Sequence, residues 1–439
     1  MNERMILTAT VMGLGMHHGA WRLRDGDPFD YADPDYYAQI ATTGEAGALH
    51  AIFLADTLDV SEERFARPNL GALDPAVVLA VMAAHTDRIG LVGTSSTTFN
   101  EPFNLARRFA SLDAMSRGRA GWNAVTTFVP AVAGNFGGTP LPPHEERYAR
   151  AEEFLDVVID LWESWEPDAT VGDKASGVFV DPARVHVLDH RGPHFAVRGP
   201  STLPRSRQGR PVIFQAGASE GGRELAARYA DVVFTAQNTL GAATAFRADI
   251  RRRATAHGRS PDEIKVLPGL LPVVGSTTAE ARARKEALDE LRGIGPELEK
   301  LAMRVGVPVT ELRLDEPLPV ELIRTNGAFR GSHGFRDAAV ELATREGLTV
   351  RELLYANGGG HLQVVGTPEE IADTAEAWFT AGGADGFNLM IDAFPTGLDS
   401  VVDHVLPLLR KRCLFQHDYA GATLRVNLGL PPHPSQPWK

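Results

Sequence analysis

Two stretches of this chain place hydroxyl and backbone N–H groups where a loop turns into a helix. The first, residues 143–154, carries Tyr148 near the start of a helical pattern. The second, residues 211–221, carries Ser219 directly after an apolar strand pattern. The first N–H groups of a helix have no partner within the helix and favour an anion. Two such donor clusters at one pocket would hold a phosphorylated cofactor or substrate, which indicates an enzyme.

Each of these residues has a second interpretation. Tyr148 could be an aromatic side chain that packs its helix onto the rest of the fold. Ser219 lies in Gly-Ala-Ser-Glu-Gly, a G-x-S-x-G match to the nucleophile elbow of α/β-hydrolases, and Asp392 and His404 follow in the order that such a triad requires. However, four strand–helix units precede the match, and no His-Gly-Gly-Gly segment for an oxyanion hole precedes it. An anion-binding helix cap is therefore favoured, with the hydrolase as an alternative.

Polar residues also end three of the expected strands. Asp56 ends the second strand, Thr94 ends the third, and Asn123 lies in the fourth. If the strands form a parallel barrel, these side chains collect at the rim formed by the carboxyl ends. An Asn there can offer both a donor and an acceptor to a planar heterocycle. The alternatives are a turn-capping Asp and a solvated Ser/Thr loop.

The histidines do not form a metal motif. His186, His190 and His194 recur every four residues, but Gly192-Pro193 breaks any helix that would bring them together. No metal site is expected. His17-His18 follow the first strand, and His361 follows a glycine run in a long insertion, so these residues could face a ligand pocket. Taken singly, each could equally be an ordinary loop histidine.

Composition narrows the class of protein. The chain has 439 residues, a formal net charge of −12 and one cysteine, Cys413. The negative charge argues against nucleic-acid and anionic-membrane partners. One cysteine excludes an intrachain disulfide framework and indicates a reducing, cytoplasmic setting. No apolar run reaches the roughly 18 residues of a membrane span.

Apolar runs of strand length alternate with helical patterns. We expect strands at residues 6–12, 51–55, 89–94, 120–126, 212–216, 232–235, 266–274 and 386–391. Nearly continuous apolar strands that alternate with helices indicate a parallel sheet covered on both faces. Eight such units favour an α/β fold of the closed (β/α)8 type, a TIM barrel.

The spacing of these units predicts the domain organisation. Residues 1–430 form one barrel domain with insertions after strands 4 and 7, at about residues 168–208 and 277–366, and residues 431–439 form an irregular tail. Insertions of this kind usually build lids or oligomer contacts. Helix starts are predicted at Asp74-Pro75 and at two capping boxes, which begin at Ser260 and Thr367.

Several segments together resemble the bacterial luciferase-like flavin monooxygenases. The similar branch contains nitrilotriacetate monooxygenase component A, pristinamycin synthase and dibenzothiophene sulfone monooxygenase. The resemblance runs from about residue 5 to residue 430 in matching order and spacing. The segments that carry it are residues 18–22, 53–56, 106–113, 116–123, 135–137, 144–150, 215–219, 366–368 and 383–387.

The resemblance implies a TIM barrel that binds FMN at its carboxyl rim, as a homodimer or homotetramer. Reduced FMN would come from a separate NAD(P)H:FMN reductase, and the enzyme would use O2 to oxygenate a small organic substrate, with cleavage of a carbon–heteroatom bond as one outcome. A non-catalytic barrel that binds flavin or the deazaflavin F420 is a further alternative. The substrate itself is not predicted, because it depends on the insertion at residues 277–366.

The resemblance also implies site residues. The flavin-contacting positions are Asp56, Thr94, Asn123, His144, Tyr148 and Ser219. Tyr148 and Ser219 would bind the phosphate, while the first three would border the ring. His18 or His361 would be the catalytic hydrogen-bond donor beside the reacting oxygen. Phe53, Trp122 and Phe128 are expected either beside the ring or in the core.

Overall fold

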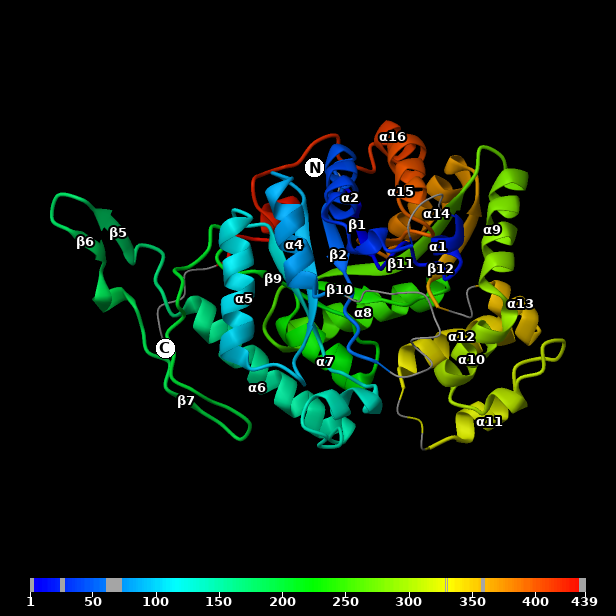
Figure 1. The fold of residues 1–439 in the computed structure, drawn as a ribbon, viewed down its shortest axis with the longest axis horizontal. Coiled ribbons are helices and arrows are strands. Elements are labelled where there is room, and N and C mark those ends of the chain that lie inside the picture. Colours follow the sequence, from blue (N-terminus) through cyan, green and yellow to red (C-terminus); the bar gives the residue numbers. More distant parts are fainter. Residues whose placement is uncertain are drawn as a thin grey trace.

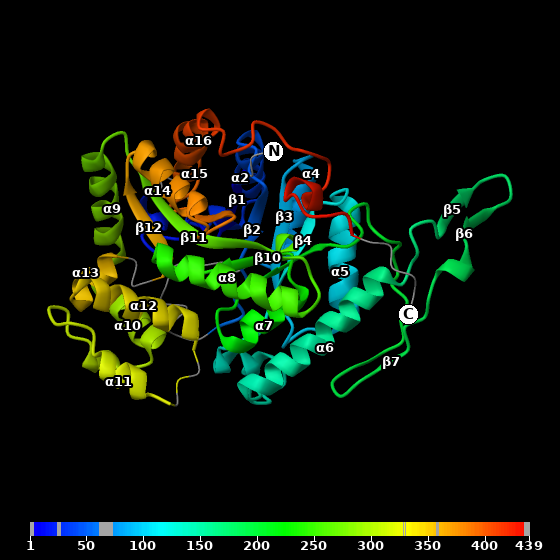
Figure 2. The ribbon, with the colours of Figure 1, turned by 180° about the vertical axis from the view of Figure 1, so that it is seen from behind.

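A closed barrel of eight parallel strands forms the centre of the molecule (Figures 1 and 2). The computed structural model describes residues 4–23, 28–60, 73–327, 329, 331–356 and 360–433. The barrel strands are β1 (Ile6–Val11), β2 (Ala51–Leu54), β3 (Gly90–Ser96), β4 (Ala120–Val125), β9 (Val212–Gln215), β10 (Val232–Thr235), β11 (Lys265–Val274) and β13 (Gly386–Met390). Each pairs in parallel with the next, and β13 pairs with β1. The predicted (β/α)8 fold and all eight expected strands are confirmed.

Helices cover the outside of the barrel. They are α2 (Pro34–Ala46), α4 (Pro75–Ala84), α5 (Pro102–Met115), α6 (His144–Glu163), α7 (Glu220–Tyr229), α8 (Leu240–Ala256), α14 (Pro368–Thr380) and α16 (Leu406–Lys411), with the short helices α1 (Ala20–Leu23), α15 (Thr396–Ser400) and α17 (Leu424–Asn427). The predicted caps at Asp74 and Thr367 are present: Asp74 accepts the Ala76 N–H, and Thr367 forms a full capping box with Glu370. The capping box predicted at Ser260 is wrong. Ser260 begins only a short 3-10 turn, because Lys265 already starts β11.

The strands are buried on both faces, as a covered parallel sheet requires. Outward side chains such as Leu7, Ile52 and Trp122 pack against the helices. Inward side chains such as Phe53 and Phe214 fill the barrel, and Leu424 and Leu428 of α17 and its end join the same cluster. The interior at the amino-terminal end is therefore packed with apolar groups, which leaves the opposite rim for a polar site.

The insertion after β4 leaves the barrel as two hairpins. The first pairs β5 (Thr170–Asp173) with β6 (Val178–Val180), and the second pairs β7 (His190–Arg191) with β8 (Ala196–Val197). Figures 1 and 2 show the first hairpin projecting far from the barrel. Glu153 of α6 holds the second hairpin, since it accepts from His190 Nε2 and from the N–H groups of His194 and Phe195 at 2.9–3.0 Å.

The insertion after β11 begins with α9 (Thr278–Arg292) and continues as a group of helices that we call the cap. The cap consists of α10 (Ile294–Val305), α11 (Val320–Thr325), α12 (His333–Glu346) and α13 (Val350–Tyr355). It has a hydrophobic core of its own, built around residues such as Leu301, Ile323, Val340 and Leu353. Figures 1 and 2 show the cap (yellow) beside the end of the barrel where α7 lies. It is positioned to cover the carboxyl rim.

One strand of this insertion was not predicted. β12 (Leu362–Gly366) pairs in parallel with the second half of β11, from Leu270 to Val274. β11 has ten residues and extends beyond the barrel, so its free edge can accept an additional strand. This pairing places His361, the residue before β12, at the mouth of the barrel.

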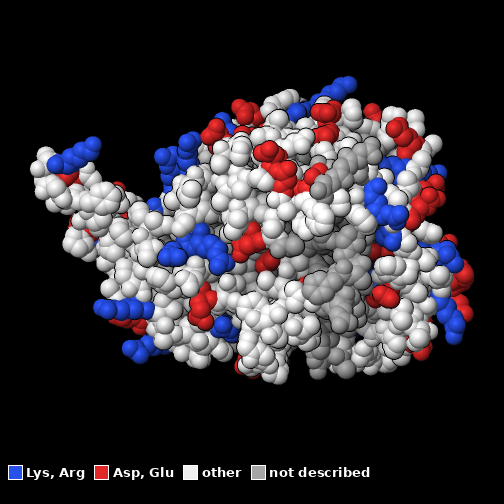
Figure 3. All heavy atoms as spheres, viewed as in Figure 1, with Lys and Arg blue, Asp and Glu red and all other residues white. Residues whose placement is uncertain are grey.

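The surface does not suggest a highly charged partner. Figure 3 shows Lys and Arg side chains interspersed with Asp and Glu side chains on that face. Among the described residues, no helix is both long enough and apolar enough to cross a membrane.

Candidate functional site

The two predicted donor residues meet at the carboxyl rim. The hydroxyl oxygen of Tyr148 lies 3.2 Å from Ser219 Oγ, and either hydroxyl can donate the hydrogen bond. Tyr148 comes from the first turns of α6, while Ser219 is the N-cap of α7 and accepts the Gly222 N–H at 3.2 Å. A Cβ at Gly221 would lie 3.1 Å from the Tyr148 ring, so the lack of a side chain there lets the two elements approach. Two stretches distant in the sequence therefore supply hydroxyl groups to one point of the rim.

A cleft of about 1260 Å³ opens at this point. Its lining includes Ser219 and Arg223 from α7 and its start, His144 and Arg147 from α6, and Phe128 from the loop after β4. The His144 ring lies 4.6 Å from the Tyr148 ring, centroid to centroid. Burial, the charge of Arg147 and the nearby His333 lower the pKa of His144. The cleft thus combines hydroxyl groups, guanidinium groups and a neutral imidazole, which suits a ligand with one anionic end.

Asn123 and Thr94 lie together inside the barrel. Asn123 Nδ2 donates to Thr94 Oγ1 at 3.0 Å, and both side chains are buried. Asn123 Oδ1 has no hydrogen-bond partner among the described residues. Across the barrel, Thr8 and Thr10 donate to Asn388 Oδ1 at 3.0 and 2.9 Å, and Asn388 Nδ2 likewise has no partner in the described part of the chain. Buried amide groups without partners are costly, so their presence indicates a site for a polar ligand.

His361 lies at the mouth of the barrel. Its ring stacks on Phe234 of β10, with centroids 5.1 Å apart, and meets the edge of Phe335 from α12 at 5.4 Å. A Cβ on Gly269 of β11 would lie 2.2 Å from His361 Nδ1, so only glycine leaves room for this ring. Burial, together with Arg304 and Lys300, lowers the pKa of His361 to about 3. His361 is therefore a neutral imidazole, and its Nδ1 has no partner among the described residues.

Asp56 follows β2 at the same rim and is partly buried. Burial, with a further contribution from Asp74, raises the pKa of Asp56 to about 6. The carboxyl group of Asp56 therefore changes charge near neutral pH, which is unusual for an Asp at a surface turn.

His17 and His18 connect the barrel to the insertion after β11. His17 Nδ1 accepts the Gly19 N–H at 3.0 Å, and its Nε2 lies 3.1 Å from Asp289 of α9. His18 Nδ1 lies 2.5 Å from Glu297 Oε1, and its Nε2 lies 3.3 Å from Lys300 Nζ. Burial lowers the pKa of His18 to about 4. Both ring nitrogens of His18 are engaged, so in this arrangement His18 fastens the cap, and His361 is the better placed of the two predicted catalytic histidines.

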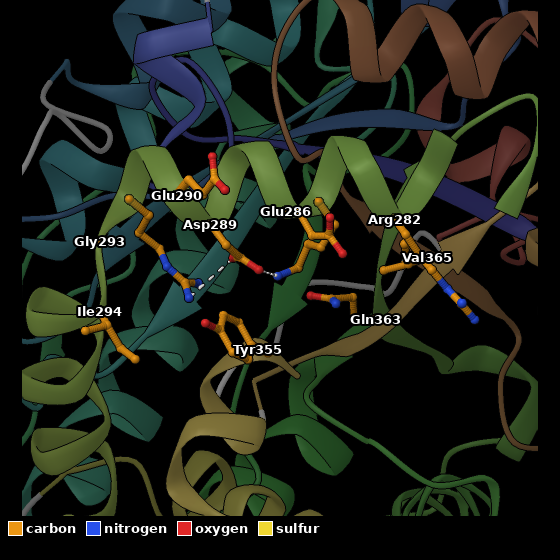
Figure 4. A pocket seen from close by; sticks show the side chains of 11 residues that line it. Arg282, Glu286, Asp289, Glu290, Gly293, Ile294, Tyr355, Gln363 and Val365 are labelled. Atoms are coloured by element: carbon orange, nitrogen blue, oxygen red, sulfur yellow. Dashed lines mark hydrogen bonds and ion pairs between the residues drawn. The ribbon is translucent and has the colours of Figure 1, made fainter. Parts of the chain in front are cut away.

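A second cavity, of about 680 Å³, lies between α9, α13 and β12 (Figure 4). Its charged lining residues are Arg282, Lys285, Arg292, Glu286, Asp289 and Glu290. Figure 4 shows Asp289 between Lys285 and Arg292, which lie 2.5 and 3.3 Å from its carboxylate oxygens. Because these cations and carboxylates neutralise one another, and Asp289 also holds His17, this cavity forms part of the support for the rim.

The aromatic residues proposed for the ring environment divide into two groups. Trp122 is fully buried outside the barrel, between Phe109, Phe154 and Trp162, so it belongs to the core. Phe53 is inside the barrel and contacts Phe234, while Phe128 lines the large cleft.

The geometry does not form the hydrolase triad. The Ser219 hydroxyl contacts Tyr148 and the Gly222 N–H. Asp392 is bound by Arg284 at 2.7 Å and accepts the Ala393 N–H. Among the spaced histidines, His186 pairs with Glu166 and His190 with Glu153, so these two side chains are held by different carboxylates.

Sequence reasoning missed three residues of the large cleft. Arg223 Nε donates to the Ala218 carbonyl at 2.9 Å and so fixes the loop before Ser219. His333 and Phe329 reach the cleft from the cap. Arg223 lies four residues after Ser219 on one face of a helix, a spacing that could have revealed it. The other two depend on where the cap lies, which has no local sequence signal.

The fold and this rim define a (β/α)8-barrel enzyme with a binding site for an anionic, ring-containing ligand. A family model described as luciferase-like monooxygenase matches residues 5–385. The chain is 42% identical to nitrilotriacetate monooxygenase component A of Aminobacter aminovorans, over 98% of this chain and 97% of that protein. It is 40% identical to N-acetyl-S-(2-succino)cysteine monooxygenase of Bacillus subtilis (strain 168), over 98% and 97%.

A solved structure is similar throughout. Riboflavin lyase RcaE, with modified FMN and the substrate riboflavin, gives a TM-score of 0.86 at 33% identity and covers 98% of this chain and 97% of its own. The chain belongs to the luciferase-like monooxygenase family. It is a flavin-dependent monooxygenase, and the hydrolase and non-catalytic alternatives have no support.

Proposed function

We propose that this chain is the oxygenase component of a two-component system that binds reduced FMN and oxygenates a small organic molecule with O2. A separate NAD(P)H:FMN reductase supplies the reduced cofactor. The observation that carries this proposal is the hydrogen-bonded pair of Tyr148 and Ser219 at two adjacent helix starts. The name of one relative, nitrilotriacetate monooxygenase component A, supports the division into components.

The residues present fit the two ends of FMN. At the phosphate end, the Tyr148 and Ser219 hydroxyls and the first N–H groups of α7 can donate to a dianion. At the ring end, the amide of Asn123 has an unpartnered oxygen among the described residues, and Thr94 lies beside it. Asp56 and His144 complete the predicted set, at the ring side and in the cleft respectively.

Reduced FMN, when bound, supplies the electrons for activating O2, and the protein must position the ring and exclude water. Phe234 and Phe335 flank His361 and make this part of the mouth apolar. His361 is neutral at physiological pH and holds one proton on its imidazole ring. We assign His361 as the donor beside the reacting oxygen, and His18 as the residue that holds the cap above it.

The substrate class follows from the relatives only in outline. Their names include nitrilotriacetate and N-acetyl-S-(2-succino)cysteine, small molecules with carbon–nitrogen or carbon–sulfur bonds. We propose a small organic substrate of this kind and oxidative cleavage at a carbon–heteroatom bond. The cap, which covers the rim, would select the substrate.

The outer face of α4 supports a homo-oligomer. Its sequence, PAVVLAVMAA, contains no polar side chain, yet Val77 is 66% exposed. A helix that is apolar all round is usually buried. We propose that a second copy of the chain covers this face in a homodimer or homotetramer, and that the protein works in the cytoplasm, where reduced flavin is made.

Oxygen uptake tests the proposal. The purified chain should consume O2 and form product when it receives reduced FMN and a suitable substrate. With NADH and oxidised FMN it should be inactive until a flavin reductase is added. Oxidation of NADH by the chain alone would contradict the two-component assignment.

A further inference from the structure

Helix α12 of the cap begins in the same cleft as Ser219. His333, the first residue of α12, lines this cleft together with His144 and Ser219. The next residue, Gly334, touches the loop that leads to Ser219: a Cβ on Gly334 would lie 2.6 Å from the Ala218 Cβ. The cap and the barrel therefore meet at the end of the cleft where Tyr148 and Ser219 donate.

The imidazole of His333 is held in a defined state. Arg336, one turn later on α12, donates to His333 Nδ1 at 3.0 Å. Because Nδ1 accepts, the neutral ring carries its proton on Nε2. The edge of Phe329 meets the ring at 5.3 Å, and the Arg336 guanidinium lies 4.7 Å above Phe329. This bracing presents one N–H donor from the cap side of the cleft.

The other charged groups of the cleft are consistent with an anion. Arg147 and Arg223 come from the barrel side, and Arg336 supports His333 from the cap. The acidic residues that line the cleft are Glu145, Glu220 and Asp337, and all three are exposed. Water and salt screen exposed carboxylates, so they oppose an anion only weakly.

We propose that His333 completes the phosphate subsite from the cap, so that the phosphate of FMN, by binding both the Tyr148–Ser219 pair and His333, draws the cap onto the barrel. The inference rests on the proposed binding of FMN at this rim. It makes His333 a residue that selects FMN over riboflavin, and it makes the phosphate the part of the cofactor that closes the site.

Flavin titration measures the selection directly. FMN and riboflavin are titrated separately into the full-length protein, with flavin fluorescence as the readout. His333→Ala should weaken FMN roughly ten- to a hundredfold, the loss of a hydrogen bond to a charged group, and should leave riboflavin unchanged within about twofold. Equal losses for both flavins would overturn the proposal, as would an unchanged FMN affinity.

Two further variants separate selection from general loosening of the cap. Gly334→Ala keeps the imidazole and favours the helix by intrinsic propensity, but its Cβ forces α12 away from Ala218. It should reduce FMN affinity selectively, as His333→Ala does. Glu341→Ala is the matched control, because it removes another contact of α12 with the barrel, at Thr239, far from the phosphate donors in sequence. It should change both flavin affinities equally.

Hydrogen exchange tests the closure. FMN should slow amide exchange in the cap of the wild-type protein, riboflavin should not, and His333→Ala should lose the effect of FMN. Protection of the cap by riboflavin to the same extent would contradict the role of the phosphate. If the wild-type protein bound neither flavin, the proposed function itself would fail; if it bound FMN but His333→Ala kept the selectivity, only this inference would fail.

Discussion

The hydroxyl of Tyr148 lies 3.2 Å from Ser219 Oγ, although 71 residues separate them in the chain. The contact exists because α6 and α7 are neighbours outside the barrel, joined by Tyr229, whose hydroxyl donates to Asp156 at 2.8 Å. Two helices that begin at the same rim place their free N–H ends at the same point. An anion-binding site is the direct consequence.

The phosphate contacts can be tested by single substitutions. Tyr148→Phe and Ser219→Ala should each weaken FMN binding by about 1–2 kcal/mol, because each removes one hydrogen bond to a charged group. Equilibrium titration with FMN measures the change. Tyr355→Phe, which removes the hydroxyl of a half-exposed tyrosine in the second cavity, is the matched control and should have no effect. FMN binding that survived both rim substitutions unchanged would place the phosphate elsewhere.

His361 should govern how efficiently oxygen reaches the product. His361→Ala removes a donor and opens the apolar mouth to water, so more of the consumed O2 should appear as hydrogen peroxide. Gly269→Ala should act in the same way, since its Cβ would displace the imidazole. The ratio of product to O2 consumed is the measurement, and exposed His85→Ala serves as control. An unchanged ratio in both variants would remove His361 from the site.

Asp56 should make the stability of the protein depend on pH. Burial raises its pKa from 3.8 to about 6, so between these values the folded state retains a proton that the unfolded state has lost. The stability that Asp56 contributes is complete below pH 3.8 and is lost as the pH rises through 6. Asp56→Asn should therefore stabilise the protein by about 1–2 kcal/mol at pH 8, after allowance for partial exposure, and hardly at all near pH 4.

Denaturant unfolding at the two pH values provides the comparison for Asp56. Asn retains an oxygen that can accept the Thr57 N–H, so the substitution chiefly removes the charge. A loss of stability of similar size at both pH values would show that Asp56 makes contacts worth more than its burial costs.

The apolar face of α4 should mediate self-association. Val77→Glu puts a charge on a side chain that is 66% exposed in the single chain, so it should leave the fold intact and split the oligomer. Light scattering coupled to size-exclusion chromatography gives the mass. A wild-type protein that is monomeric would contradict the proposed interface at once.

Much of the fold follows from local pattern. Eight apolar strands and their helices can be located because a covered parallel sheet leaves a continuous apolar signature in each strand. Asp74 and Thr367 signal their helices through side chains that bond to nearby N–H groups. Ser260 has the same residues around it, but the start of β11 leaves room for only a 3-10 turn. Local chemistry is therefore decisive only where the tertiary fold leaves space.

The residues of the site divide in the same way. Tyr148, Ser219, Asn123 and Thr94 are tied to strand ends and helix starts, and the structure brings each pair together. His333 could not be predicted, because its place depends on how the cap packs against Ala218 through contacts distant in sequence. β12 was missed for the same reason, since its partner is the projecting half of β11.

The central claim is that the rim at Tyr148 and Ser219 holds the phosphate of FMN while the ring enters the barrel mouth. A crystal structure of the protein with FMN tests this most directly. We predict phosphate oxygens within hydrogen-bonding distance of Tyr148 Oη and Ser219 Oγ, and the ring beside the Asn123 amide. FMN bound with its phosphate in another part of the molecule, or no FMN at this rim at saturating concentration, would contradict it.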